Sequence, residues 1–169
     1  MEELTLIQKA GQGDREAFCT IYSLYRNKLY RYAYYRLGNP EDAEDAVSEC
    51  VLSAWRQISG LKKPEAFQGW IYKILSASCG KRIREKIAGR EGVEDLKSEW
   101  TESEPADTVS VELMEALEQL VEDEREVVLL TVVAGLTSRE AGLICGMTAG
   151  GIRSKQSRAL KKMREYLEG

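Results

Sequence analysis

Residues 135–164 read GLTSREAGLICGMTAGGIRSKQSRALKKMR, and this stretch decides the fold of the C-terminal part of the chain. Thr137, followed three residues later by Glu140, forms a capping box that marks the start of a short helix. Gly146 ends that helix, and Thr148 caps a second, basic helix. This arrangement predicts a helix-turn-helix, whose second helix enters the major groove of DNA. A plain helical hairpin is the alternative, but the basic residues cluster on the second helix and hardly touch the first.

Three longer helices are predicted in the N-terminal half. Apolar and aromatic residues recur at three- and four-residue steps over residues 14–37, which is the period of an amphipathic helix. Asn39 as N-cap and Pro40 at the first helical position open a second helix over residues 40–58. A third helical stretch covers residues 65–87 and becomes strongly basic toward its end.

The same periodicity predicts where tyrosines and cysteines lie. The first helix carries six tyrosines, which we interpret mainly as core residues, with a base-stacking surface as the alternative: Tyr22, Tyr25, Tyr30, Tyr32, Tyr34 and Tyr35. The four cysteines occupy apolar or semi-apolar helical positions and are expected to be buried, reduced thiols: Cys19, Cys50, Cys79 and Cys145.

Two further segments organise the C-terminal half. Residues 91–110 lose hydrophobic periodicity and are rich in acidic side chains, so we expect a flexible acidic linker there. The apolar run over residues 127–133 has the composition of a strand, but first-turn acids before it and Gly135 after it favour a helix. The prediction is an all-α chain of two small domains, residues 1–90 and 111–169, joined by this linker.

The charges are distributed unevenly along the chain. The net charge is −4, yet residues 61–90 carry eight basic and two acidic side chains, and residues 127–169 carry seven basic and three acidic ones. Between them, residues 91–126 carry two basic and 14 acidic side chains. Two basic regions with an acidic spacer predict two surfaces that face a polyanion, and a polyanion would repel the spacer.

The composition also excludes several classes of protein. The chain of 169 residues has no histidine and no Cys-x-x-Cys pair, so we expect no metal, no cofactor and no enzymatic activity. No apolar stretch reaches the length of a membrane span, and the N-terminus lacks the pattern of a signal peptide. A cytoplasmic protein without membrane insertion is expected.

Both halves of the chain resemble the extracytoplasmic-function (ECF) sigma factors of bacterial RNA polymerase. Residues 117–164 are similar to region 4 of that family, with its G-x-[ST]-x-x-E-[IA]-A-x-x-L-G motif before the recognition helix. The N-terminal half resembles region 2: GDREAFCTIYSLYRNKLYRYAYY at residues 13–35, NPEDAEDAVSECVLSAWRQI at residues 39–58 and PEAFQGWIYKILSASCGKRIREK at residues 64–86. Two such blocks in this order are far more specific than a helix-turn-helix alone.

The resemblance implies three functional surfaces. Core RNA polymerase would be bound by Asp42, Glu44, Asp45, Glu49 and Trp55, with core packing as the alternative for Trp55 because it ends the apolar stripe of its helix. The −10 promoter element would be bound and melted by Lys62, Lys63, Phe67, Trp70, Lys73, Lys81 and Arg84. The −35 element would be read by Thr148, Arg153, Ser154, Lys155, Ser157 and Arg158. The acidic linker would lie along the polymerase path that nascent RNA later takes.

The sequence therefore predicts a sigma factor whose partners are core RNA polymerase, promoter DNA and, as a further candidate, an anti-sigma factor. Many family members have asparagine and aspartate where this chain has Ala77 and Lys81. A helix-turn-helix regulator that does not bind polymerase is the alternative, although it leaves the segment at residues 39–58 without a purpose.

Overall fold

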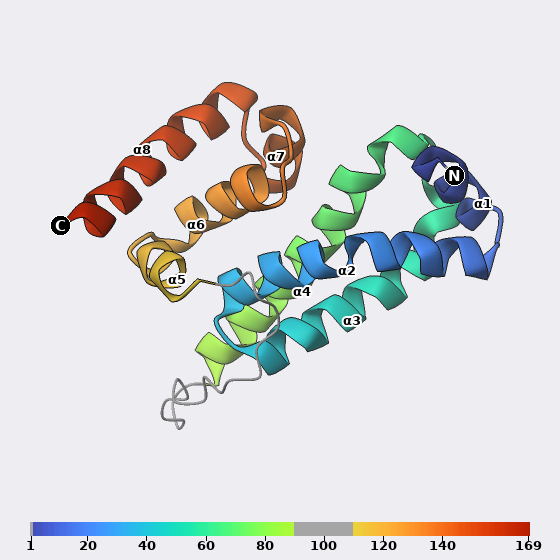
Figure 1. The fold of residues 1–169 in the computed structure, drawn as a ribbon, viewed down its shortest axis with the longest axis horizontal. Coiled ribbons are helices and arrows are strands. Elements are labelled where there is room, and N and C mark those ends of the chain that lie inside the picture. The colour runs from blue at the N-terminus through green and yellow to red at the C-terminus, as the bar shows by residue number, and fades with distance from the viewer. Residues whose placement is uncertain (1, 90–109) are drawn as a thin grey trace.

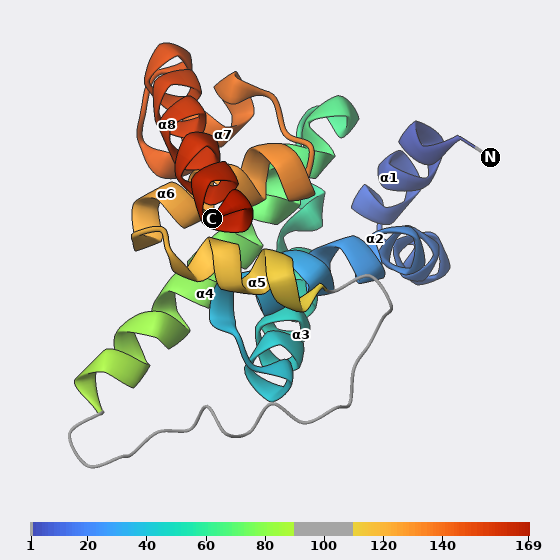
Figure 2. The same ribbon diagram turned by 60° about the vertical axis from the view of Figure 1, so that its left-hand side comes forward.

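The computed structural model describes residues 2–89 and 110–169, which form helices and turns with no β-strand among them. The helices gather into two groups, α1 to α4 and α5 to α8, that pack against each other (Figure 1, Figure 2). This confirms the predicted all-α, two-domain fold. None of the helices in the described part has the length and apolar character that crossing a bilayer requires. The predicted linker lies outside the described residues except for Ser110, whose side chain caps α5.

The N-terminal domain is a bundle built on α2 (Arg15–Leu37), α3 (Pro40–Gln57) and α4 (Phe67–Ala88). Asp14 and Asn39 accept the capping hydrogen bonds that open α2 and α3, and Gly38 ends α2 in the left-handed conformation at φ 74°. Short 3₁₀ turns at Ile58–Gly60 and Pro64–Ala66 connect α3 to α4. The three helices bury aliphatic and aromatic side chains between them, among them Ile21, Leu29, Tyr32, Val47, Phe67, Tyr72 and Leu75.

One helix was not predicted. α1 (Glu3–Gly11) packs on α2, and the Tyr25 hydroxyl donates a hydrogen bond of 2.6 Å to the Glu3 carboxylate. The residue before α1, Glu2, makes no side-chain capping bond. The helix therefore lacks the start signal that marks α2 and α3, and its buried face amounts to Ile7 and Ala10.

The C-terminal domain contains α5 (Val111–Glu118), α6 (Glu122–Val128), α7 (Ser138–Cys145) and α8 (Ala149–Glu168). The apolar run over residues 127–133 is helical, as predicted, but its second half, Leu129–Val133, is a π-helical turn. In this turn the Ala134 amide reaches back five residues to the Leu129 carbonyl at 2.8 Å.

The predicted helix-turn-helix is confirmed in α7 and α8. Thr137 Oγ1 accepts from the Glu140 amide at 3.0 Å, while Glu140 Oε1 accepts from the Thr137 amide at 2.9 Å. Gly146 follows at φ 73°. Gly142 was not singled out by the sequence, yet a Cβ there would lie 2.4 Å from the Met147 carbonyl oxygen. The tight turn therefore depends on a glycine in the last part of α7.

The tyrosines and three of the cysteines follow the predicted pattern. Four tyrosines of α2 are buried and Tyr22 and Tyr30 are partly buried, which confirms a core role for this aromatic group. Cys50 and Cys79 are fully buried and Cys145 is partly buried. The expectation for Cys19 was wrong, because α2 presents that residue to solvent.

A thiol-labelling experiment tests this arrangement. Burial raises the pKa of Cys50 and Cys79 to about 12, so both thiols are shielded and protonated at neutral pH. We expect a thiol reagent to modify Cys19 rapidly and to reach Cys50 and Cys79 only after denaturation, as measured by mass spectrometry of digested protein. Rapid modification of Cys79 in the native state would contradict the packing of α3 on α4.

A second test concerns the buried hydroxyl of Tyr72, which has no hydrogen-bond partner within the described part of the chain. Because an unpaired buried polar group is costly, we expect Tyr72→Phe to leave the free energy of unfolding unchanged or to raise it by up to about 1 kcal/mol. Tyr25→Phe is the matched control, since it loses the hydrogen bond to Glu3 and should cost about 1–2 kcal/mol. Urea unfolding measures both, and a larger loss for Tyr72→Phe than for Tyr25→Phe would be the contrary result.

Candidate nucleic-acid and polymerase interfaces

The exposed face of α8 is basic and polar. Ile152, Ala159 and Met163 are buried and fix the orientation of the helix against its domain. The opposite face therefore points outward and carries Arg153, Ser154, Ser157, Arg158 and Lys161, all of them exposed. Arginine and serine side chains can donate hydrogen bonds to base edges and phosphates, so this face has the chemistry of a DNA-reading helix.

Two of the predicted −35 readers differ from the exposed residues of α8: Thr148 caps the helix, and Lys155 is partly buried. Thr148 is exposed, and its Oγ1 accepts from the Gly151 amide at 2.9 Å, so it holds the first turn of α8. A Cβ at Gly151 would lie 3.2 Å from that oxygen, which explains a glycine at this place. Lys155 is partly buried and lies toward the side of α8 that packs on its own domain.

A third basic residue of α8 is engaged with α6. Lys162 Nζ lies 2.9 Å from the Glu124 carboxylate, and this bond lowers the pKa of Glu124. Lys162 is therefore a less available phosphate contact than the exposed Lys161.

The exposed side of α4 forms a second basic stripe. Trp70, Lys73, Lys81 and Arg84 recur at helical spacing and fall within about 80° of arc around the helix axis. Ala77 lies on the same stripe and is exposed, so the position where many ECF sigma factors have asparagine is on this surface and has no polar side chain here. Lys62 and Lys63 precede the helix and are also exposed. We call the following residues the α4 stripe: Lys62, Lys63, Trp70, Lys73, Lys81 and Arg84. Phe67 is not included.

Phe67 is separated from the others. Its side chain is 1% exposed and packs against the rings of Tyr25 and Trp70, with centroid separations of 5.2 and 5.7 Å. Phe67 therefore packs against Trp70 from within the core, and its own ring is not available to stack on a base. Trp70 is partly buried and remains at the surface.

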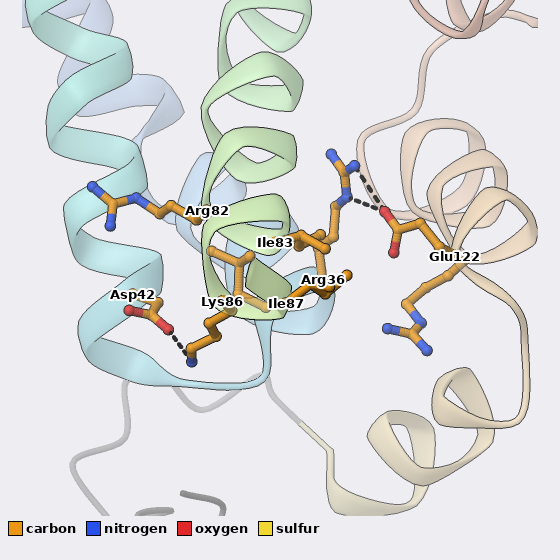
Figure 3. A pocket seen from close by; sticks show the side chains of 9 residues that line it. Arg36, Asp42, Arg82, Ile83, Lys86, Ile87 and Glu122 are labelled. Atoms are coloured by element: carbon orange, nitrogen blue, oxygen red, sulfur yellow. Dashed lines mark hydrogen bonds and ion pairs between the residues drawn. The ribbon is translucent and has the colours of Figure 1, made fainter. Parts of the chain in front are cut away.

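The structure divides the predicted polymerase-binding residues between two sides of α3. Asp42, Asp45 and Glu49 face the basic end of α4, where Lys86 Nζ lies 2.8 Å from Asp42 (Figure 3). Arg82 lies 4.0 Å from Asp45 and 3.7 Å from Glu49, and its Nε is buried with no hydrogen-bond partner among the described residues.

Glu44 and Trp55 lie toward α2 instead. The Glu44 carboxylate is near enough to Tyr22 to add to the raised pKa of that tyrosine, whose main cause is burial. Trp55 is partly buried, with its ring centroid 5.1 Å from that of Phe18. Trp55 therefore has a packing role on this side of α3.

Sequence reasoning missed an apolar residue on the acidic side of α3. Leu52 is 56% exposed and follows Asp45 and Glu49 at helical spacing. Single exposed apolar residues are common on protein surfaces, so Leu52 is a candidate contact only because it lies beside the acidic residues expected to bind polymerase. The signal was present in the sequence, because Leu52 is out of phase with the buried stripe of α3.

The described residues contain no group of three or more His, Cys, Asp or Glu side chains placed to hold a metal ion. The fold and its surfaces define an all-helical DNA-binding protein with two basic helices in separate domains. Residues 21–87 match the family Sigma-70 region 2, and residues 110–163 match Sigma-70, region 4. The chain belongs to the sigma-70 family of RNA polymerase sigma factors, within the ECF group.

Individual relatives agree with this assignment. The chain is 31% identical to the ECF RNA polymerase sigma factor BldN of Streptomyces coelicolor, over 97% of this chain and 65% of BldN. It is 28% identical to the ECF RNA polymerase sigma factor SigW of Bacillus subtilis, over 95% of this chain and 94% of SigW. It thus spans slightly less than two thirds of BldN and nearly all of SigW.

Two solved structures have a similar fold. The sigma factor RpoE of Bartonella quintana, in complex with the anti-sigma factor NepR, superposes with a TM-score of 0.76 over 89% of this chain and 96% of that chain, at 25% identity. CnrH, in complex with the cytosolic domain of CnrY, gives 0.73 over 98% of this chain and 97% of that chain, at 21% identity. Each superposition includes both domains together.

Proposed function

We propose that this chain directs promoter-specific transcription initiation by binding core RNA polymerase through α3, the −10 element through the α4 stripe and the −35 element through α8. The observation that carries the proposal is the presence of two exposed basic helices in one chain, each in a domain that matches a sigma region. A polymerase-independent regulator would need the helix-turn-helix alone. The proposed role is one of binding, with no chemistry of its own, in the cytoplasm where promoter DNA and polymerase meet.

The side chains on each helix determine which partner that helix is proposed to bind. Arg153 and Arg158 can form bidentate hydrogen bonds to guanine edges, whereas Lys161 acts as a point charge toward phosphate. On α4, Trp70 supplies a flat ring and the flanking lysines supply positive charge, which together suit an unstacked single strand. On α3, the acidic face with Leu52 suits a polymerase surface that is basic and partly apolar.

An anti-sigma factor is a further proposed partner. RpoE of Bartonella quintana, which superposes over both domains, is bound to the anti-sigma factor NepR. A protein that stabilises this arrangement of the two domains would compete with polymerase and DNA.

The first test separates base reading from phosphate binding on α8. We expect Arg153→Ala and Arg158→Ala each to weaken promoter binding by the holoenzyme by about 1–3 kcal/mol, unevenly across −35 variants. Lys161→Ala should weaken all sequences alike and reduce the salt dependence, since it removes one phosphate contact. Binding titrations on a panel of −35 sequences at several salt concentrations measure this. If all three variants weakened binding to every sequence equally, the assignment of base reading to α8 would be wrong.

The second test concerns α3. We expect Leu52→Ala to change the free energy of unfolding by less than about 0.5 kcal/mol and to lower affinity for core polymerase by at least about fivefold. Trp55→Ala should instead lower the free energy of unfolding by about 2–3 kcal/mol, because its ring packs on Phe18. Urea unfolding and polymerase binding are measured on the same preparations. Unchanged polymerase affinity for Leu52→Ala would place the polymerase contact elsewhere.

A further inference from the structure

Three aromatic rings in contact lead from the core of the N-terminal domain to the indole of the α4 stripe. Trp70 lies on the first turn of α4 and is partly buried. Its ring centroid is 5.7 Å from that of Phe67, and Phe67 and Tyr25 pack edge to face at 5.2 Å with an interplanar angle of 70°. Phe67 is 1% exposed and Tyr25 is 7% exposed, so the core encloses the two inner rings.

The Tyr25 ring is tied to α1. Its hydroxyl donates a hydrogen bond of 2.6 Å to the carboxylate of Glu3, in the first turn of α1. A bond of this length to a carboxylate is among the stronger hydrogen bonds in proteins. Burial and the bond to Glu3 raise the pKa of Tyr25, so the hydroxyl stays protonated and remains a donor. The Lys28 ammonium lies over the same ring, 5.7 Å from its centroid.

α1 also packs beside the loop that carries the first two lysines of the α4 stripe. It contacts both 3₁₀ turns, Ile58–Gly60 and Pro64–Ala66, that flank Lys62 and Lys63 (Figure 1). A Cβ at Gly11, the last residue of α1, would lie 3.6 Å from the carbonyl oxygen of the first of these turns. α1 therefore supports both the loop and the ring stack at the beginning of the α4 stripe, although it precedes the residues that match Sigma-70 region 2.

We propose that Glu3 and Tyr25 are positioning residues for DNA binding. Through Phe67 they hold the Trp70 indole in the orientation that stacks on an unpaired base of the −10 element. This inference rests on the proposed function, because it takes Trp70 as a DNA contact. Neither positioning residue needs to touch DNA, since each acts by keeping the indole in one conformation before the strand arrives. A ring that is correctly placed for only part of the time binds with proportionally lower apparent affinity.

Fluorescence of the free protein tests the positioning step by itself. The chain has three tryptophans, so Trp55→Phe/Trp100→Phe leaves Trp70 as the single one and keeps an aromatic ring at position 55. In this background we expect Glu3→Ala and Tyr25→Phe to increase the amplitude of fast indole motion in time-resolved anisotropy. The measurement needs neither polymerase nor DNA.

Two further variants separate the hydrogen bond from the charge. Glu2→Ala is the matched control, because it removes a neighbouring exposed carboxylate that makes no side-chain capping bond, and it should leave the indole signal unchanged. Glu3→Gln removes the charge but keeps a side-chain oxygen that can accept from the Tyr25 hydroxyl, so it should restore the wild-type signal.

DNA binding by the holoenzyme tests the consequence. The probes are a fork-junction DNA, in which the −10 strand of a promoter mapped by run-off transcription is unpaired, and a fully paired −35 duplex. We expect Glu3→Ala and Tyr25→Phe each to lower affinity for the fork junction by about threefold to tenfold and to leave affinity for the duplex unchanged. Glu3→Ala/Tyr25→Phe should match the single variants, because all three lose the same bond. A general loss of stability would instead lower affinity for both probes.

The outcomes separate the positioning role from the proposed function. Unchanged indole motion in Glu3→Ala and Tyr25→Phe would overturn the positioning role, whatever the DNA titrations give. Greater indole motion with unchanged affinity for the fork junction would overturn it as well. If Trp70→Ala leaves affinity for the fork junction at the wild-type value, the proposed binding of the −10 element by Trp70 is wrong, and the fluorescence result stands apart from it.

Discussion

One buried guanidinium contacts both domains and is compensated across the interface between them. Arg36 belongs to the N-terminal domain, but its compensating carboxylates, Glu122 and Glu126, belong to the other. A buried ion pair contributes little net stability compared with apolar packing, while loss of one partner leaves a costly uncompensated charge. Such a pair therefore specifies how two surfaces meet more than how tightly they adhere.

The surfaces assigned to DNA and polymerase are arranged around that contact. α8 presents its basic face away from the interface, because Ile152 and Met163 anchor its other side. α4 has two roles: its exposed stripe is proposed to bind the −10 element, and its beginning touches the C-terminal domain through Gln68. The surface proposed to bind the −10 element therefore lies next to the contact between the two domains.

The sequence predicted those features that depend on local signals. The caps at Asn39 and Thr137 and the glycine after α7 gave the helix boundaries, since a capping side chain acts within three residues. α1 was missed because it has no such cap and because its buried face, Ile7 and Ala10, is too short to show an apolar period. The apolar period could not show the π-helical turn at Leu129–Val133, which satisfies the same hydrophobic pattern as an α-helix.

Features that depend on distant residues were not predictable in the same way. Phe67 was expected at the DNA-binding surface because it lies between lysines and Trp70, but it packs on Tyr25, 42 residues earlier in the chain. The acids of α3 were expected to act together, and the helix directs Asp42 and Glu44 to different sides. The contact between Arg36 and Glu122 spans 86 residues, and nothing in either local sequence indicates it.

Run-off transcription on a library of genomic promoter fragments tests the account most directly. Full-length wild-type protein is combined with core polymerase, and transcript starts are mapped by sequencing, with either component alone as control. The account predicts transcripts only when both are present, starting downstream of a shared pair of −10 and −35 sequences. Tight, sequence-specific binding of these fragments by the chain alone, with no transcript from the combined proteins, would contradict it and identify a regulator that acts without polymerase.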